Sequence, residues 1–135
     1  MDRNYTRRVL NCIYNVYYEL GPGLLESIYQ EALISELRDN GFFVEEEQEI
    51  PVYYKGKKLK TRFRLDLIVD KKLIIELKSV KEYHKVFEKQ LYTYLRLLNC
   101  ELGYVFNFYV DKFSDGIHTV HNTLYNPLLH YSLDI

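Results

Sequence analysis

One segment limits the possible folds of this chain more than any other, the run RFRLDLIVDKKLIIELKSV at residues 62–80. Two short apolar runs flank a turn at residues 70–72, which is typical of a β-hairpin. Three charged residues, Asp66, Glu76 and Lys78, interrupt the apolar runs. Charged side chains are seldom fully buried unless they are paired or bind a metal. The hairpin therefore indicates either an ion-pair network or a functional site.

Side-chain alternation predicts that the three charges share one face of the hairpin. Successive side chains of a strand point to opposite faces of the sheet, so the intervening apolar residues form a core face. The residues expected on that core face are Leu65, Leu67, Val69, Leu73, Ile75 and Leu77. A solvated outer face with cross-strand ion pairs would also explain the charges. However, Ile68 and Ile74 lie on the same face as the acids and make it partly apolar.

Two carboxylates on paired strands have a chemical use. They supply hard oxygen ligands, which suit Mg²⁺ or Mn²⁺. Such a cation polarises a phosphate and lowers the pKa of a bound water. Lys78 follows Glu76 by two residues and therefore points to the same face, where its ammonium can orient water or neutralise charge on the phosphate. The spacing Asp-x9-Glu-x-Lys is weakly specific by itself.

The remaining hydrophobic pattern predicts helices packed on a mixed sheet. Apolar spacing of three and four residues indicates helices over about residues 4–20, 25–40 and 83–99. Alternation and turn signals indicate strands over about residues 42–54, 58–70, 72–80 and 102–110, with a short edge strand at 117–122. The order α-α-β-β-β-α-β predicts an α/β fold with a mixed central sheet. We expect one domain over residues 1–135, in which the tail 123–135 is unassigned.

Two polar residues in the predicted helices are further candidates. Glu26 lies in the first turn of the second helix, where the helix dipole favours an acid, and beside the apolar stripe of that helix. Gln90 lies in the stripe of the third helix, where a polar amide needs hydrogen-bond partners. A purely structural role is the alternative for both residues.

Charge and composition limit how the chain can bind a polyanion. The 135 residues contain 18 Lys and Arg against 19 Asp and Glu, so the net charge of −1 predicts only a local nucleic-acid footprint. Two sets of cations are candidates, namely the row Lys58, Lys60, Arg62 and Arg64 and the series Lys81, Lys85 and Lys89. The chain also has 14 Tyr, whose rings can stack on bases, and Tyr29 is included among the expected contacts.

The cysteines and the apolar runs indicate the compartment. Cys12 and Cys100 form no CxxC or Cys/His ligand spacing, so a structural zinc site is not expected. Free thiols suit a reducing compartment. No apolar run has the pattern of a signal peptide or the length of a membrane span. We expect a cytoplasmic protein without membrane contact; the sequence does not exclude a nucleoid or nuclear location.

The motifs taken together resemble those of the GxxExxY family, a branch of the PD-(D/E)XK nuclease superfamily. Gly23-x-x-Glu26-x-x-Tyr29, RLDLIV, IIELKSV, KQLYTYL and GYVFNF occur in the order of that family over about residues 5–110. The resemblance implies a restriction-endonuclease-like core and hydrolysis of phosphodiester bonds that depends on Mg²⁺, for which Mn²⁺ substitutes. Two features depart from the family. An aromatic residue usually follows the first strand acid, but here that residue is Leu67, and the tail beyond about residue 117 has no counterpart in the family.

The resemblance also implies catalytic roles, which map onto Glu26, Asp66, Glu76, Lys78 and Gln90. The two strand acids and the Leu77 carbonyl would bind the metal, and the helix acid would bind a second metal or hold a metal-bound water. The lysine would orient the nucleophile, and the glutamine would order the site or contact the substrate strand.

Three functions are compatible with these features. The first is a metal-dependent nuclease that acts on DNA, with a homodimer as one expected assembly because so small a core often needs a second copy to embrace a duplex. The second is a non-catalytic nucleic-acid-binding or complex-assembly subunit that keeps the fold. The third is a structural homo-oligomer in which the acids only form an ion-pair network.

Overall fold

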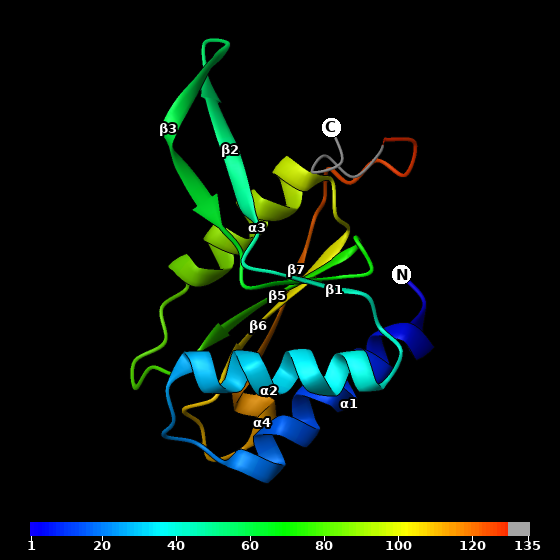
Figure 1. Ribbon diagram of the computed structural model, residues 1–135, viewed down its shortest axis with the longest axis vertical. Coiled ribbons are helices and arrows are strands. Elements are labelled where there is room, and N and C mark those ends of the chain that lie inside the picture. Colours follow the sequence, from blue (N-terminus) through cyan, green and yellow to red (C-terminus); the bar gives the residue numbers. More distant parts are fainter. Residues whose placement is uncertain (130–135) are drawn as a thin grey trace.

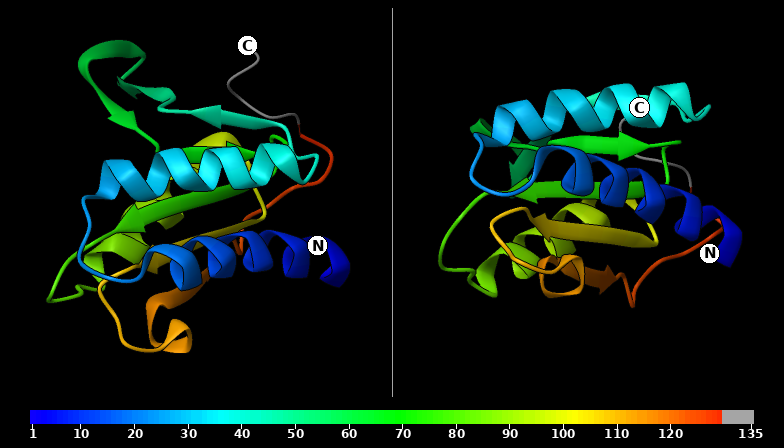
Figure 2. Two further views of the ribbon diagram at one scale, coloured as in Figure 1. Left: turned by 60° about the horizontal axis from the view of Figure 1, so that its bottom comes forward. Right: turned by 90° about the horizontal axis from the view of Figure 1, so that it is seen from below.

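The computed structural model describes residues 1–129, and these residues form a mixed sheet with helices on both faces. The elements are α1 (Arg3–Leu20), α2 (Glu26–Asp39), β1 (Val44–Glu46), β2 (Glu49–Tyr54), β3 (Lys57–Arg64), β4 (Leu67–Val69), β5 (Leu73–Lys78), α3 (Val86–Leu98), β6 (Leu102–Asn107), α4 (Phe113–Gly116) and β7 (Ile117–His121). The five-stranded sheet has the order β1-β4-β5-β6-β7, in which β5 and β6 are parallel and the other pairs are antiparallel. Helices α1 and α2 cover one face, and α3 covers the other (Figures 1 and 2). The predicted restriction-endonuclease-like α/β architecture is therefore confirmed.

Both faces of the central sheet are buried, whereas the sequence predicted a single core face. Leu67, Leu73 and Ile75 pack toward α1 and α2 as predicted. Ile68 and Ile74 are equally buried, because α3 packs on their side of the sheet. The carboxylates that share a face with these two isoleucines therefore lie beside a second apolar core and not on a solvated surface.

The predicted strands 42–54 and 58–70 are each divided by a sharp bend. The pairing Glu46↔Leu67 in the central sheet continues with the same register into Glu49↔Arg64 of the separate β2–β3 sheet. Across the bend, the Glu47 N–H donates to the Asp66 carbonyl at 2.9 Å. Glu47 has a left-handed backbone with φ 50°, which interrupts the extended geometry. The β2–β3 ribbon consequently projects away from the rest of the molecule (Figure 1).

The bend also changes which way one core residue points. Leu65 was expected on the face of Leu67, but it is buried in the α3 core with Ile68. Strict alternation requires uninterrupted extended backbone, and residues 65–66 lie between β3 and β4. The assignment of Leu65 to the first core face is therefore wrong.

Both hairpin turns occur where the sequence predicted them. Lys55 and Gly56 join β2 to β3, and both have positive φ, as a two-residue type I′ turn requires. Residues 70–72 join β4 to β5, and Asp70 and Lys71 among them also have positive φ. Asp70 is further held by its side chain, which accepts hydrogen bonds from the Phe43 N–H at 2.8 Å and the Tyr5 hydroxyl at 2.9 Å.

The helices and the tail differ from expectation mainly at their ends. Helix α3 begins at Val86 and not near residue 83, β6 ends at Asn107 and not at residue 110, and α4 was not predicted. The edge strand at 117–122 is confirmed as β7. Of the unassigned tail, residues 123–129 contain no helix or strand, and Asn126 hydrogen-bonds to Asn99 at the C-terminus of α3. Residues 130–135 lie outside the described part. None of the helices within residues 1–129 combines the length and apolar character needed to cross a membrane.

Candidate active site

The structure brings Asp66 and Glu76 together where the bent hairpin enters the sheet. The register of β4 on β5 pairs Leu67 with Ile75 and so places the two acids opposite each other. The Leu77 N–H donates to Asp66 Oδ2 at 2.8 Å, and the Asp66 N–H donates to Glu76 Oε1 at 3.1 Å. Each carboxylate is thus oriented by a backbone N–H of the neighbouring segment.

Burial makes the charged form of this pair costly. Glu76 is only 8% exposed. Burial, and next the charge of Asp66, raise the pKa of Glu76 to about 8. Burial also raises the pKa of Asp66, although the Leu77 N–H and then the Lys78 charge act in the opposite direction. At neutral pH the pair therefore favours a bound proton or a bound cation.

We expect the metal-free protein to lose stability as the pH rises. Because the pKa of Glu76 is higher in the folded chain than in the unfolded chain, its stabilising proton is retained at low pH and lost as the pH rises through about 8. The free energy of unfolding should fall between about pH 5 and about pH 9, by up to about 1.4 kcal/mol per pH unit for one proton. Urea unfolding in the presence of a chelator measures this slope. A free energy that stays constant or rises over this range would contradict the prediction.

Glu26 lies next to the pair but is held by a different group. It begins α2 as predicted, and its Oε1 accepts a hydrogen bond from the Ser79 N–H at 3.2 Å. The Ser79 hydroxyl donates to the Leu24 carbonyl at 2.7 Å, so the start of α2 is joined to the chain leaving β5. The charge of Glu26 contributes to the raised pKa of Asp66. Within residues 1–129, however, no group of three or more His, Cys, Asp and Glu side chains is spaced to hold a metal ion.

Lys78 ends β5 beside the carboxylates. Its charge opposes the rise in the pKa of both Asp66 and Glu76, as expected of a cation nearby. The side chain is half-buried, and Nζ lies 4.5 Å from the centroid of the Phe87 ring on α3. The structure therefore places Lys78 in the predicted neighbourhood, with an aromatic ring limiting its freedom.

Asn107 is a buried polar residue that sequence reasoning missed. It is 3% exposed and lies next to Lys78 in the β5–β6 register. Its Nδ2 donates to the Val80 carbonyl at 3.0 Å, and its Oδ1 accepts from the Val80 N–H at 3.1 Å and from the Tyr109 N–H at 3.2 Å. The side chain thereby fixes the chain just after Lys78 and Ser79. A lone Asn within the apolar run GYVFNF was the signal that could have revealed it.

We expect Asn107→Asp to disturb both stability and the site. The substitution keeps the shape but removes the donor to the Val80 carbonyl, and leaving such a buried group unsatisfied costs about 1–3 kcal/mol. The loosened chain should also lower any nuclease rate. Urea unfolding and a cleavage assay measure the two effects.

Asn122→Asp is the matched control for this prediction. Asn122 is also buried, and its Nδ2 donates to the carbonyls of Leu95 and Cys100, away from the carboxylates. Both variants should be less stable, but only Asn107→Asp should lose more activity than its unfolded fraction explains. Equal activity per folded molecule in the two variants would limit Asn107 to a structural role.

Gln90 does not occupy the buried stripe in which it was predicted. It is exposed, and the buried residues of α3 are Leu91, Leu95 and Leu98. The prediction was wrong because the packing of α3 on the sheet, which helical spacing does not specify, selects the buried side. Gln90 lies between Phe87 and Tyr94 by helical spacing, and these two half-buried rings pack on the α3 core. Burial and then the charges of Glu76 and Asp66 raise the pKa of Tyr94. The side of α3 that carries Tyr94 therefore faces the two acids.

Tyr29 has a structural position, and the predicted nucleic-acid contact is wrong for this residue. Its side chain is 0% exposed, and its ring stacks on Phe108 with a centroid distance of 3.8 Å. Its hydroxyl donates to the Gly21 carbonyl and accepts from the Leu24 N–H at 3.1 Å. Tyr29 therefore holds the turn that precedes Glu26 and has no surface for a ligand.

The predicted cations are distributed over two exposed segments. Arg62 and Arg64 on the ribbon form ion pairs with Glu49, at 2.9 Å, and with Glu47. Lys58 and Lys60 lie farther along the ribbon toward its tip and are exposed. Lys81 and Lys85 are exposed in the segment between β5 and α3, which follows Lys78. The bend thus directs the basic row at residues 58–64 away from the acids, although Asp66 follows this row by only two residues.

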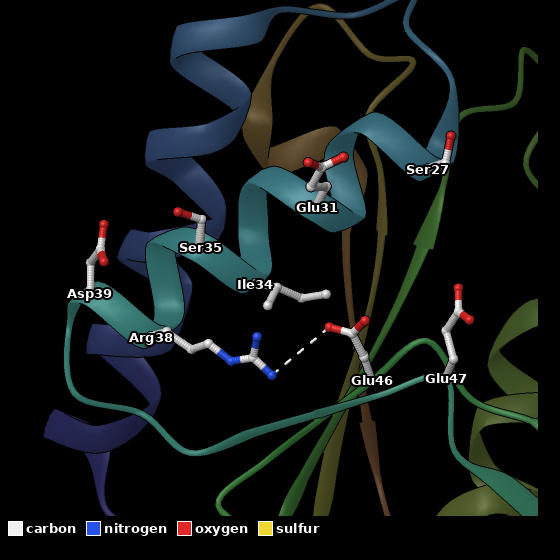
Figure 3. A pocket seen from close by; sticks show the side chains of 8 residues that line it. All are labelled: Ser27, Glu31, Ile34, Ser35, Arg38, Asp39, Glu46 and Glu47. Carbon is white, nitrogen blue, oxygen red and sulfur yellow. Dashed lines mark ion pairs between the residues drawn. The ribbon is translucent and has the colours of Figure 1, made fainter.

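A hollow of about 650 Å³ lies between α2 and the bend that follows β1 (Figure 3). Its lining residues are Ser27, Glu31, Ile34, Ser35, Arg38, Asp39, Glu46 and Glu47. Arg38 points across it toward Glu46, with an N–O distance of 3.8 Å (Figure 3). The acidic lining repels a polyanion, and neither Asp66 nor Glu76 contributes to it. This hollow is therefore distinct from the carboxylate pair.

The fold and the carboxylate–lysine arrangement together define a nuclease-type α/β protein. In agreement, a family model described as the PD-(D/E)XK nuclease superfamily matches residues 3–120. The chain therefore belongs to the PD-(D/E)XK nuclease superfamily. This membership suggests a hydrolase with a nucleic-acid substrate. No curated protein and no solved structure matches the chain.

Proposed function

We propose that this protein is a metal-dependent nuclease of the GxxExxY branch that hydrolyses phosphodiester bonds of DNA. The observation that carries the proposal is the pair of half-buried Asp66 and buried Glu76, whose carboxylates have raised pKa values and lie beside Lys78. Perturbed acids that adjoin a cation are typical of catalytic sites. The match to a nuclease superfamily over residues 3–120 supports the same chemistry.

The donor set fits a hard divalent cation. Burial raises the pKa of both carboxylates, and a neighbouring acid adds to the rise in each case, Asp66 for Glu76 and Glu26 for Asp66. A bound cation would offset both the burial and this repulsion. Asp66, Glu76 and the Leu77 carbonyl would hold Mg²⁺ or Mn²⁺, with Glu26 available to a second metal or a water. When bound, the cation supplies polarisation of the phosphate and activation of water.

The surrounding residues of the chain would orient the substrate and stabilise charge. Lys78 would neutralise the negative charge that develops on the phosphate, as a preorganised electrostatic group. Asn107 and the Ser79–Glu26 hydrogen bond would keep Lys78 in place, because both restrain the chain that leaves β5. Gln90, on the side of α3 that looks toward the acids, would contact the substrate strand.

The proposal extends to compartment and assembly. Cys12 and Cys100 are free and buried, which suits a reducing cytoplasm. A homodimer would let so small a core embrace a duplex.

A cleavage assay tests the proposed function directly. The protein is incubated with end-labelled single- and double-stranded DNA and RNA in Mg²⁺, Mn²⁺ or EDTA, with Asp66→Asn as the matched variant. We expect DNA cleavage that requires the metal and disappears in Asp66→Asn. Binding without cleavage in any metal would instead favour the non-catalytic nucleic-acid-binding subunit. Cleavage that is unchanged in EDTA or in Asp66→Asn would contradict the role given to the pair.

A further inference from the structure

The β2–β3 ribbon separates the positive charge of the chain from its negative charge. Residues 50–63 contain Lys55, Lys57, Lys58, Lys60 and Arg62 and no acid. The other residues carry 13 of the 18 Lys and Arg and all 19 Asp and Glu. A chain whose net charge is only −1 therefore has a basic arm on an acidic body. Such an arm is attracted to a polyanion that the body alone would repel.

The ribbon is exposed over its outer half and anchored at its base. Every residue from Tyr53 to Arg62 is exposed, and the ribbon extends beyond the sheet and helices (Figure 1). At the base, Ile50 is buried in the α3 core, and Phe63 meets Tyr94 with a centroid distance of 5.3 Å. The pKa of Tyr94 is raised by burial and then by the charges of Glu76 and Asp66, which are therefore near its ring. The arm is therefore fastened to the molecule close to the carboxylate pair.

The cations nearest the base already have partners. Arg62 and Arg64 are paired with Glu49 and Glu47, so a phosphate would have to compete with a carboxylate for each of them. Within residues 1–129, Lys55, Lys57 and Lys58 at the tip form no ion pair with an acid. Tyr53 and Tyr54 beside them are 61% and 62% exposed, and Lys55 Nζ lies 5.5 Å from the centroid of the Tyr54 ring. The tip thus combines lysines that no acid within residues 1–129 neutralises with two exposed tyrosine rings.

We propose that the outer half of this ribbon, residues 53–60, is an arm that enters the major groove of duplex nucleic acid. This inference rests on the proposed function, because it assigns a second contact between the nuclease and its substrate, at a distance from the bond that is cut. A two-stranded ribbon has the width that the major groove admits. The lysines contact phosphates on the groove edges, and the tyrosines contact sugar and base edges.

The geometry of the arm also sets where it binds. Lys58 precedes Asp66 by eight residues of mostly extended chain, which span about 26 Å at about 3.3 Å per residue. Base pairs rise by about 3.4 Å each, so the tip can reach a groove at most about 7–8 base pairs from the bond at the carboxylate pair. A duplex much shorter than that cannot occupy both places at once. Affinity should therefore depend on duplex length in a way that requires the tip.

Binding in the presence of a chelator tests the arm without any cleavage. The variant Lys55→Gln, Lys57→Gln, Lys58→Gln removes three tip charges. The variant Arg3→Gln, Arg7→Gln, Lys112→Gln removes three exposed charges from α1 and the N-cap of α4, two helices that lie at the other end of the molecule from the ribbon (Figure 1). Anisotropy with labelled duplexes of about 6 and about 20 base pairs is measured over a range of salt concentrations. We expect the tip variant to lose about 2.7 from the slope of log K against log salt, at about 0.9 per phosphate contact, while the control variant keeps it. Only the proteins with an intact tip should prefer the longer duplex.

The outcomes separate this inference from the proposed function. Equal salt slopes for the wild-type and tip variants would overturn the arm, as would a length preference that survives in the tip variant. If the metal-loaded protein cleaves only single strands and the tip variant cleaves them at the wild-type rate, the role proposed for the ribbon is wrong and the proposed nuclease function is retained. If no nucleic acid is bound or cut but an acidic protein binds the tip, both are wrong. Melting temperatures show whether each variant is folded.

Discussion

Lys78→Met is expected to lower the rate of phosphodiester hydrolysis by about 100- to 1,000-fold, the scale seen when one preorganised electrostatic group is removed. Methionine keeps the apolar stem that packs near Phe87 and removes only the charge. The pKa values of Asp66 and Glu76 should rise further, because the Lys78 charge now lowers both. Cleavage rate, Mn²⁺ affinity and melting temperature on this one variant measure the effect.

Lys72→Met is the matched control for this experiment. Lys72 also lies over an aromatic ring, with Nζ 4.0 Å from the centroid of Tyr5. It immediately precedes β5, however, whereas Lys78 is the last residue of that strand. Loss of a cation–π contact alone should therefore affect the two variants alike, by about 0.5–2 kcal/mol of stability. Only Lys78→Met should lose activity in excess of its unfolded fraction. A folded Lys78→Met protein that still cuts at nearly the wild-type rate would remove Lys78 from the chemistry.

Glu76→Gln is expected to abolish metal-dependent cleavage and, without metal, to stabilise the protein at alkaline pH. The amide removes one hard anionic ligand from the pair, so Mn²⁺ affinity should fall. It also removes a buried carboxyl whose pKa is raised by burial and by Asp66, so the stability lost as the pH rises through about 8 should be retained. Calorimetric titration with Mn²⁺ and urea unfolding at about pH 9 measure the two effects.

The control for Glu76→Gln is Glu46→Gln. Glu46 is an exposed acid that pairs with Arg38 at 3.8 Å beside the hollow between α2 and the bend after β1. Its loss should leave cleavage, metal affinity and the pH dependence of stability unchanged. If Glu46→Gln instead abolished cleavage while Glu76→Gln did not, the acidic hollow would be the site and the assignment of the buried pair would fail.

These two experiments also discriminate among the three functions that the sequence left open. A structural ion-pair network would lose stability when either Lys78 or Glu76 is neutralised, since a buried charge that loses its partner is costly. A nuclease site should instead lose activity in both variants and gain stability in Glu76→Gln. A binding subunit would keep its affinity for nucleic acid in both variants and never cleave.

Local sequence determined the elements whose geometry depends on near neighbours. Gly56 and the run at residues 70–72 specified both turns, and alternation in β4 and β5 specified the register that sets Asp66 opposite Glu76. Helix α2 begins at Glu26, as the glycine-rich turn before it predicted. Such features follow from backbone preferences and from periodicity, which are properties of a few adjacent residues.

Only the tertiary structure decided which of the candidate residues lie at the site. Glu47 adopts a left-handed backbone inside a run that reads as one strand, and this single bend separates the basic row from Asp66. The packing of α3 left Gln90 exposed, and the stacking of Tyr29 on Phe108 buried a ring that was predicted to contact nucleic acid. Asn107 comes into contact with Val80 because β6 pairs with β5, across a separation of 27 residues. These outcomes depend on packing between distant segments, and helical or strand periodicity carries no information about which neighbour covers a given side chain.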